Sequence, residues 1–350
     1  MLTAADSTAA GCPRRRGVAS ALLRSTPMRA LGTAVGLLLL VRAVNVPEAA
    51  RRLADVSPGW VAAGVALTGV SVLLGMVSWA VLLHGPGPCP RWPALISLYL
   101  RALFVGQLLP GGVGGDAVRV VETGRRIGSG PALAAVVGGR LAGALGITLW
   151  GALAALVLRD RLDARLGLMP AAVAASLALL ILVLLAALLC SDALVRRLGA
   201  GAGPARRLLA AIRPFTGTFD GYAHHPRLLA ASLGSGVASW GFNLLALSTM
   251  AHAVGISTDP EVFALVIPIS LLGTLAPFSV NGLGLREGIL VGLLANDGIG
   301  TTQAASVSLL VDLQMAPFAV AGAVIWGLRR RGRRAAAETA PTPALVPEAA

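Results

Sequence analysis

Long uncharged runs, separated by short segments rich in arginine, are the feature that most restricts how this chain can fold. The clearest runs cover residues 56–83, 166–190 and 228–251. A bilayer core requires roughly 20 consecutive apolar residues per crossing helix. Within lipid, a helix satisfies its own backbone N–H and C=O groups, which an open strand cannot do. The sequence therefore predicts an all-α fold, a polytopic bundle of transmembrane helices.

The composition agrees with residence in a membrane. Charged residues make up 13% of the chain, against about 25% in average soluble domains, and the mean hydropathy is +0.78. All 29 basic residues are arginine, and the net charge is +13. Because these arginines lie between apolar runs, we interpret them as topology signals and contacts with anionic headgroups, and we expect no nucleic-acid partner.

The remaining runs bring the prediction to about seven or eight membrane segments. For the first segment, a retained helix is favoured over a cleaved signal peptide because further spans follow it. The predicted segments are 30–41, 56–83, 141–158 (beginning nearer Pro131), 166–190, 228–251, 262–285, 288–296 and a final span ending near Leu328.

The distribution of arginine predicts the topology. Most arginines fall in 84–130, 191–227 and 329–350, which places these segments and both termini in the cytoplasm of a multi-pass cell-membrane protein. Residues 194–215 form either an amphipathic helix on the anionic leaflet or an ordinary basic loop. The predicted domains are a disordered basic tail (1–28), a transmembrane domain (29–328) and a second disordered tail (329–350), basic and then rich in Ala and Pro.

No residue pattern indicates a metal or cofactor. The three cysteines have no CxxC spacing, and the four histidines have no HExxH spacing. The stretch GGVGGD is not a Walker A loop, because no GK[ST] follows it. We therefore expect neither a cofactor nor a metal.

Two apolar segments, 98–119 and 266–287, are interrupted by proline and glycine. They read LYLRALFVGQLLPGGVGGDAVR and VIPISLLGTLAPFSVNGLGLRE. In each, a proline is followed by a glycine five residues later and an arginine nine residues later, with an acid nearby. These residues are Pro110, Gly115, Asp116 and Arg119 in the first segment, and Pro277, Gly282, Arg286 and Glu287 in the second. Both a re-entrant and a fully spanning arrangement fit the pattern.

Such broken segments predict a binding site. Non-helical backbone at membrane depth survives only where it is buried in protein or lines a cavity, and paired broken segments in corresponding halves point to a transporter site. Exposed helix N-termini favour anions, and the planar guanidinium suits phosphate. The sequence thus predicts a phosphate-headgroup site, with ordinary surface loops as the alternative.

Three ionisable residues lie in apolar surroundings: Arg101, Arg140 and Asp312. Ionisable groups within a membrane usually face the bundle interior or a water-filled cavity. We hypothesise that Arg140 and Asp312 line one interior cavity as an ion pair. The alternative is that Arg140 extends to the cytoplasmic interface.

The motifs LPGGVGGDAVR, GRLAGALG and PFSVNGLGLREG resemble those of the lysylphosphatidylglycerol synthase transmembrane family, also called flippase-like or UPF0104 proteins. The resemblance covers about residues 30–330. Arg140 matches the arginine of the family's third span, whereas the acid that usually precedes it is Gly139 here, which argues against a local ion pair. With Asn281 and Asp312, the predicted substrate-binding residues are Pro110, Gly114, Gly115, Asp116, Arg119, Arg140, Ser279, Asn281, Gly282, Gly284, Arg286, Glu287 and Asp312.

The resemblance implies a lipid flippase or lipid-handling transporter without catalysis. Its substrate would be an anionic or phosphate-bearing lipid, such as a phospholipid, an aminoacyl-phosphatidylglycerol or a polyprenyl-linked sugar. Bifunctional family members add a soluble synthase domain after the spans, and we expect no synthase activity here. The alternatives are an enzyme of lipid-linked glycosyl or aminoacyl transfer, or an accessory subunit for a neighbouring glycosyltransferase or lipid-modifying enzyme.

Overall fold

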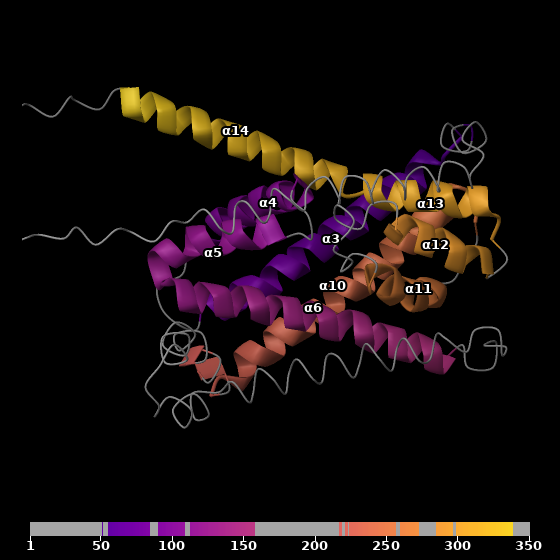
Figure 1. The fold of residues 1–350 in the computed structure, drawn as a ribbon, viewed down its shortest axis with the longest axis horizontal. Helices are drawn as coiled ribbons and strands as arrows, with labels where there is room; N and C mark the ends of the chain where they lie inside the picture. The colour runs from indigo at the N-terminus through magenta and orange to yellow at the C-terminus, as the bar shows by residue number, and fades with distance from the viewer. Residues whose placement is uncertain are drawn as a thin grey trace, which may run out of the picture.

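The structure is a computed structural model, and the described part of the chain is entirely helical or irregular, without a strand (Figure 1). The predicted all-α membrane fold is therefore confirmed. The predicted segments 30–41, 166–190 and 194–215 lie outside the described residues. The described residues are 51, 55–84, 90–108, 113–157, 217–218, 221–222, 224–256, 260–272, 285–296 and 299–338.

Four described helical stretches are long and apolar enough to cross a bilayer. They are α3 (Pro58–Leu83), α6 (Ser129–Val157), α10 (Pro226–Ala253) and the stretch Thr301–Arg331, which joins α13 (Thr301–Leu313) to α14 (Ala316–Glu338). These match the predicted spans 56–83, 141–158, 228–251 and the final span. Helix α6 starts at Ser129, in agreement with the expected beginning near Pro131.

Helix α14 continues past Leu328, where we expected the final span to end and a disordered tail to begin. It runs through the arginine-rich stretch to Glu338 and projects past α4 and α5 (Figure 1). Arginine and alanine are both strong helix formers, so a helix that leaves the apolar layer need not stop at its edge. Residues 339–350 lie outside the described part of the chain.

Helices α3 and α10 form the antiparallel centre of the bundle (Figure 1). Two serine pairs join them. The Ser78 hydroxyl donates to the Ser232 carbonyl at 2.9 Å, and the Ser232 hydroxyl donates to the Ser78 carbonyl at 2.9 Å. A second pair links the Ser239 hydroxyl to the Ser71 carbonyl at 2.9 Å. Small polar residues of this kind let membrane helices approach closely and hydrogen-bond to each other.

Two pairs of short helices flank this centre. One is α4 (Trp92–Leu108) with α5 (Val113–Ile127), and the other is α11 (Pro260–Leu272) with α12 (Leu285–Asn296). The two helices of each pair pack together, and each is shorter than the roughly 20 residues needed to span. We call α4–α5 the first hairpin and α11–α12 the second hairpin.

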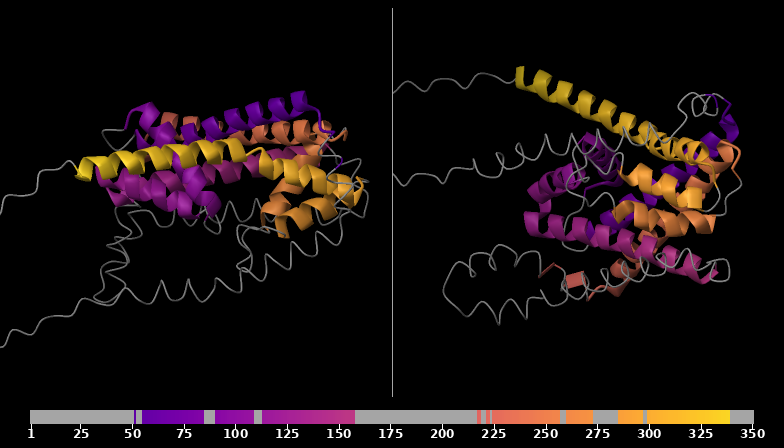
Figure 2. Two further views of the ribbon diagram at one scale, coloured as in Figure 1. Left: turned by 90° about the horizontal axis from the view of Figure 1, so that it is seen from above. Right: turned by 45° about the vertical axis from the view of Figure 1, so that its right-hand side comes forward.

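Each hairpin enters and leaves at one end of the bundle. The His84 ring, at the end of α3, stacks on Trp92 at the start of α4, and Gly128 joins α5 directly to α6. The second hairpin follows the end of α10 and leads into α13, and the Ser57 amide at the start of α3 donates to the Ala253 carbonyl at the end of α10. The two hairpins lie at opposite ends of the bundle (Figure 2).

Close backbone contacts hold the first hairpin in place. A methyl group added at Gly115 of α5 would lie 2.5 Å from the Ala102 carbonyl oxygen of α4. Likewise, a side chain at Gly322 of α14 would overlap the Leu100 carbonyl of α4. Glycine is thus required at both positions for α4 to pack against its neighbours.

Candidate functional site

A cavity of about 170 Å³ opens between the first hairpin and α6. Most of its wall is small or apolar. Its polar residues come from three helices: Tyr99 and Gln107 from α4, Arg119 from α5 and Arg140 from α6. The bare Gly115 backbone, which lets α4 and α5 approach, also lines the cavity. The cavity is therefore formed by residues of the first hairpin together with Arg140 of α6.

The Asp116 carboxylate joins two arginines from different helices. Its Oδ1 accepts a hydrogen bond from Arg119 Nη2, one helical turn away in α5. Its Oδ2 accepts from Arg140 Nε at 3.0 Å and from Arg140 Nη2 at 2.8 Å. Asp116 lies in the first turn of α5, where the helix dipole favours a negative charge. The carboxylate thus connects α5 to α6 beside the cavity.

Arg119 is held by aromatic rings as well as by Asp116. Its guanidinium carbon lies 5.2 Å from the centre of the Tyr99 ring and 5.7 Å from that of Trp79. Within the described residues, Arg119 Nε and Trp79 Nε1 are buried donors without a hydrogen-bond acceptor. A buried donor without an acceptor is costly, and the aromatic contacts of the Arg119 guanidinium offset part of that cost.

The three ionised groups leave a positive excess. One carboxylate, Asp116, faces two guanidiniums, Arg119 and Arg140. The Arg119 side chain is 14% exposed, whereas that of Arg140 is 56% exposed. An anion reaching the cavity would therefore meet an accessible guanidinium in front of a buried one. We call Asp116, Arg119 and Arg140 the cationic cluster.

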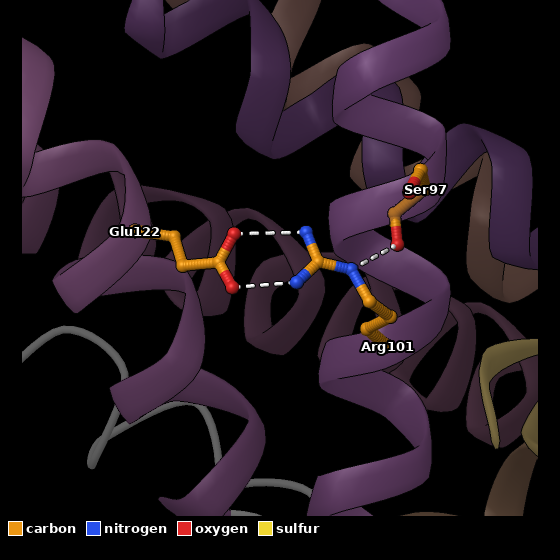
Figure 3. Close-up of polar contacts among 3 residues, drawn as sticks. All are labelled: Ser97, Arg101 and Glu122. Atoms are coloured by element: carbon orange, nitrogen blue, oxygen red, sulfur yellow. Dashed lines mark hydrogen bonds and ion pairs between the residues drawn. The ribbon is translucent and has the colours of Figure 1, made fainter. Parts of the chain in front are cut away.

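A second arginine site, an ion pair between Arg101 and Glu122, lies nearby and carries no net charge. Arg101 of α4 makes a two-pronged contact with Glu122 of α5, with N–O distances of 2.5 and 2.8 Å (Figure 3). Its Nε donates to the Ser97 carbonyl at 3.1 Å, so each of the three guanidinium nitrogens donates one hydrogen bond. The pair is electrically neutral, and the Arg101 side chain is 5% exposed. Arg101 faces the protein interior as expected, and there it holds α4 to α5.

The structure brings together part of the predicted site. Gly114, Gly115, Asp116 and Arg119 lie in the first turns of α5, beside Arg140 of α6. Buried Glu287 lies in the first turn of α12, in the second hairpin, and half-buried Asp312 lies near the end of α13. The pairing of Arg140 with Asp312 stays a prediction, while the contact that the structure shows for Arg140 is with Asp116.

The other predicted residues cannot be placed in the site. Arg286 belongs to the first turn of α12, and its side chain is not described. Outside the described residues lie Pro110, Ser279, Asn281, Gly282 and Gly284.

Sequence reasoning missed four residues that shape this region: Trp79, Tyr99, Gln107 and Glu122. Glu122 follows Asp116 and Arg119 at helical spacing, which places all three along one side of α5. Tyr99 is one of two tyrosines in the chain, a rarity that offers a weak signal. Hydropathy does not distinguish Trp79, because it lies within a continuous apolar run.

Among the described residues, no group of three or more His, Cys, Asp or Glu side chains is placed to hold a metal ion. The chemistry available at the cavity is that of hydrogen-bond donors and a net positive charge.

Comparison with known proteins agrees with the motifs. The family model described as "Lysylphosphatidylglycerol synthase TM region" matches residues 29–323. A "UPF0104 membrane protein" of Methanothermobacter thermautotrophicus is 25% identical over 320 residues, covering 84% of this chain and 90% of the relative. The resemblance inferred from the sequence is thereby confirmed.

Proposed function

Because this chain belongs to the lysylphosphatidylglycerol synthase TM region family, we propose that it binds a lipid with an anionic or phosphate-bearing headgroup and moves it across the membrane. The observation that carries the proposal is the cationic cluster, in which one carboxylate is shared by two arginines beside a cavity. An anionic headgroup would supply the missing negative charge.

The chemistry of the cluster favours a phosphate. Guanidinium groups bind phosphate through planar, charge-assisted hydrogen bonds, which are about twice as strong as neutral ones. Arg140 is exposed enough to meet a headgroup first.

The distribution of arginine supports an orientation. Exposed arginines gather at the end of the bundle that carries the base of the first hairpin: Arg91, Arg125, Arg126, Arg227, Arg329, Arg330 and Arg331. Because the cytoplasmic loops of membrane proteins carry an excess of lysine and arginine, this end of the bundle lies on the cytoplasmic side of the cell membrane. The cationic cluster then serves the cytoplasmic leaflet, whose anionic lipids are attracted to basic surfaces.

The experiment is lipid binding followed by translocation. Purified protein is analysed by native mass spectrometry for co-purifying lipids, and then titrated with phosphatidylglycerol and with phosphatidylcholine in nanodiscs. Arg140→Gln is the test variant, because its exposed side chain can change without opening a core. Arg126→Gln, an exposed arginine at the same end, is the matched control.

We expect the anionic lipid to bind in preference to the zwitterionic one. A charge-assisted contact of about 1.5–3 kcal/mol corresponds to roughly a 10- to 100-fold weaker affinity in Arg140→Gln, with no change in Arg126→Gln. In liposomes, the same variant should slow the appearance of labelled lipid in the opposite leaflet. Equal binding of both lipids by all three proteins would refute the proposal.

A further inference from the structure

A short pattern occurs twice in the chain, once in each central helix. The sequence of α3 contains SVLLGMVSW, and that of α10 contains SLGSGVASW. Both follow the pattern S-x-x-x-G-x-x-S-W. The matching residues are Ser71, Gly75, Ser78 and Trp79 in α3, and Ser232, Gly236, Ser239 and Trp240 in α10.

The matching serines are also equivalent in space. Ser71, the first serine of one pattern, pairs with Ser239, the last serine of the other, and Ser78 pairs with Ser232 in the same crossed way. The hydroxyl–hydroxyl distance is 3.2 Å in both pairs. A two-fold axis passing between the pairs exchanges them, and because α3 and α10 are antiparallel, this axis is perpendicular to the helices.

The order of elements repeats around the same axis. A long helix, a hairpin and a second long helical stretch occur as α3, α4–α5 and α6, and again as α10, α11–α12 and α13–α14. The packing repeats too. The first hairpin contacts the last helix of the second half, α4 with α14, and the second hairpin contacts the last helix of the first half, α11 with α6. Each hairpin also packs on the helix that follows it, α5 on α6 and α12 on α13.

Ionisable residues occupy corresponding places in the two halves. Arg140 lies eleven residues after the first residue of α6, and Asp312 lies eleven residues after the first residue of α13. An acid occurs in the first turn of the second helix of each hairpin, Asp116 in α5 and Glu287 in α12. The charge on the following helix is reversed, positive in the first half and negative in the second.

We propose that residues 58–157 and 226–338 contain two inverted repeats, and that Asp312 of α13, together with helices α11 and α12, forms a gate on the membrane face opposite to the cationic cluster. The axis that exchanges α3 with α10 then lies in the membrane plane, so the hairpins enter from opposite faces. Inverted repeats of this kind let one fold open to either side by exchanging the conformations of its halves. The gating role rests on the proposed lipid transport, whereas the repeat does not.

Single cysteines at matched positions test the repeat. Ser129 and Thr301 are the exposed first residues of α6 and α13, one at the base of each hairpin. Ser129→Cys and Thr301→Cys are made separately after Cys12, Cys89 and Cys190 are replaced by alanine. A membrane-impermeant maleimide is then applied to intact cells and to inverted vesicles.

We expect each cysteine to be labelled from one side only, Thr301→Cys in intact cells and Ser129→Cys in inverted vesicles. Labelling of both from the same side would overturn the inverted repeat. This result does not depend on any lipid, so it stands or falls separately from the transport proposal.

The gate is tested with Asp312→Asn, with Asp312→Glu as the conservative variant. We expect Asp312→Asn to retain phosphatidylglycerol binding at the cationic cluster but to slow translocation at least ten-fold, and Asp312→Glu to restore most of the rate. The melting temperature of each variant distinguishes a gate from a folding defect. Unchanged translocation in a folded Asp312→Asn protein would overturn the gate. If the unaltered protein bound no phosphatidylglycerol, the transport proposal would be overturned instead.

Discussion

Two arginine sites with different charge balance involve the first hairpin, and the second of them also includes Arg140 of α6. At Arg101 and Glu122, one positive and one negative group cancel, and each of the three guanidinium nitrogens donates a hydrogen bond within the hairpin (Figure 3). At the cationic cluster, one carboxylate faces two arginines, and part of the positive charge is accessible from a cavity. The charge balance of the two sites therefore differs, and we propose that the neutral pair serves stability and the cationic cluster serves ligand binding.

The arginines of the two sites also differ in how far their side chains are exposed. Arg101 is nearly fully buried, whereas Arg140 has more than half of its side chain exposed. A buried charge without its partner is strongly destabilising, while an accessible charge can exchange one partner for another. Each site can be altered separately, which makes the comparison open to experiment.

The largest effect is expected from breaking the neutral pair. Arg101→Met removes the guanidinium that makes the two-pronged contact with Glu122, and removal of one member of a buried pair costs about 3–5 kcal/mol. The double variant Arg101→Met/Glu122→Leu should recover most of that stability, because no lone charge remains. Thermal unfolding in detergent measures both. If Arg101→Met were as stable as the unaltered protein but bound less lipid, the assignment of Arg101 to stability and of the cationic cluster to lipid binding would be contradicted.

A smaller effect is expected at the buried arginine of the cationic cluster. Arg119→Lys keeps the charge but loses the planar group that lies over Tyr99 and Trp79. We expect anionic-lipid affinity to fall roughly ten-fold, corresponding to about 1.4 kcal/mol. Lipid titration in nanodiscs measures the change. Arg125→Lys, at an exposed arginine of the same helix, should bind lipid as before.

A further substitution tests whether both sites depend on the spacing of α4 and α5. Gly115→Ala would place a methyl group 2.5 Å from the Ala102 carbonyl, and overpacking of this kind costs about 1–3 kcal/mol. Gly288→Ala in α12 is the control, because nothing lies within 4 Å of the added methyl group there. We expect only Gly115→Ala to lower the melting temperature. Equal melting temperatures for the two variants would contradict the close contact.

The smallest effect on stability is expected at Ser78 and Ser232, an uncharged pair that serves as a reference for the charged ones. Ser78→Ala and Ser232→Ala remove reciprocal hydrogen bonds between α3 and α10, and such bonds in membrane proteins average about 0.6 kcal/mol. A double-mutant cycle should therefore give a coupling well below that of Arg101 with Glu122. Ser235→Ala is the control, because that hydroxyl donates to Ala231 of its own helix.

Much of the fold was predictable because uncharged length determines where a helix can cross a membrane. The spans at 56–83 and 228–251 differ by at most two residues at each end from α3 and α10. The end of α14 was predicted less well, because hydropathy marks the edge of the apolar layer, while the helix continues for as long as its residues favour helical backbone.

The cationic cluster was predicted in its residues but not in its pairing. Arg140 and Asp116 were both expected in the site, yet the substitution of Gly139 for an acid argued against a local partner for Arg140. The partner comes from α5, a different helix. The sequence shows which charged residues are unusual in a membrane segment. The packing of α5 on α6 determines which of these residues contact each other.

The contact between α4 and α14 also has a consequence for biosynthesis. The first hairpin enters the membrane early, yet one face of α4 is covered by a helix that the ribosome completes much later. Until α14 arrives, the Leu100 backbone that will meet Gly322 remains open to lipid or to insertion factors. A nascent chain stopped before residue 316 should therefore present an unfinished first hairpin, so the two halves mature together although they are made in sequence.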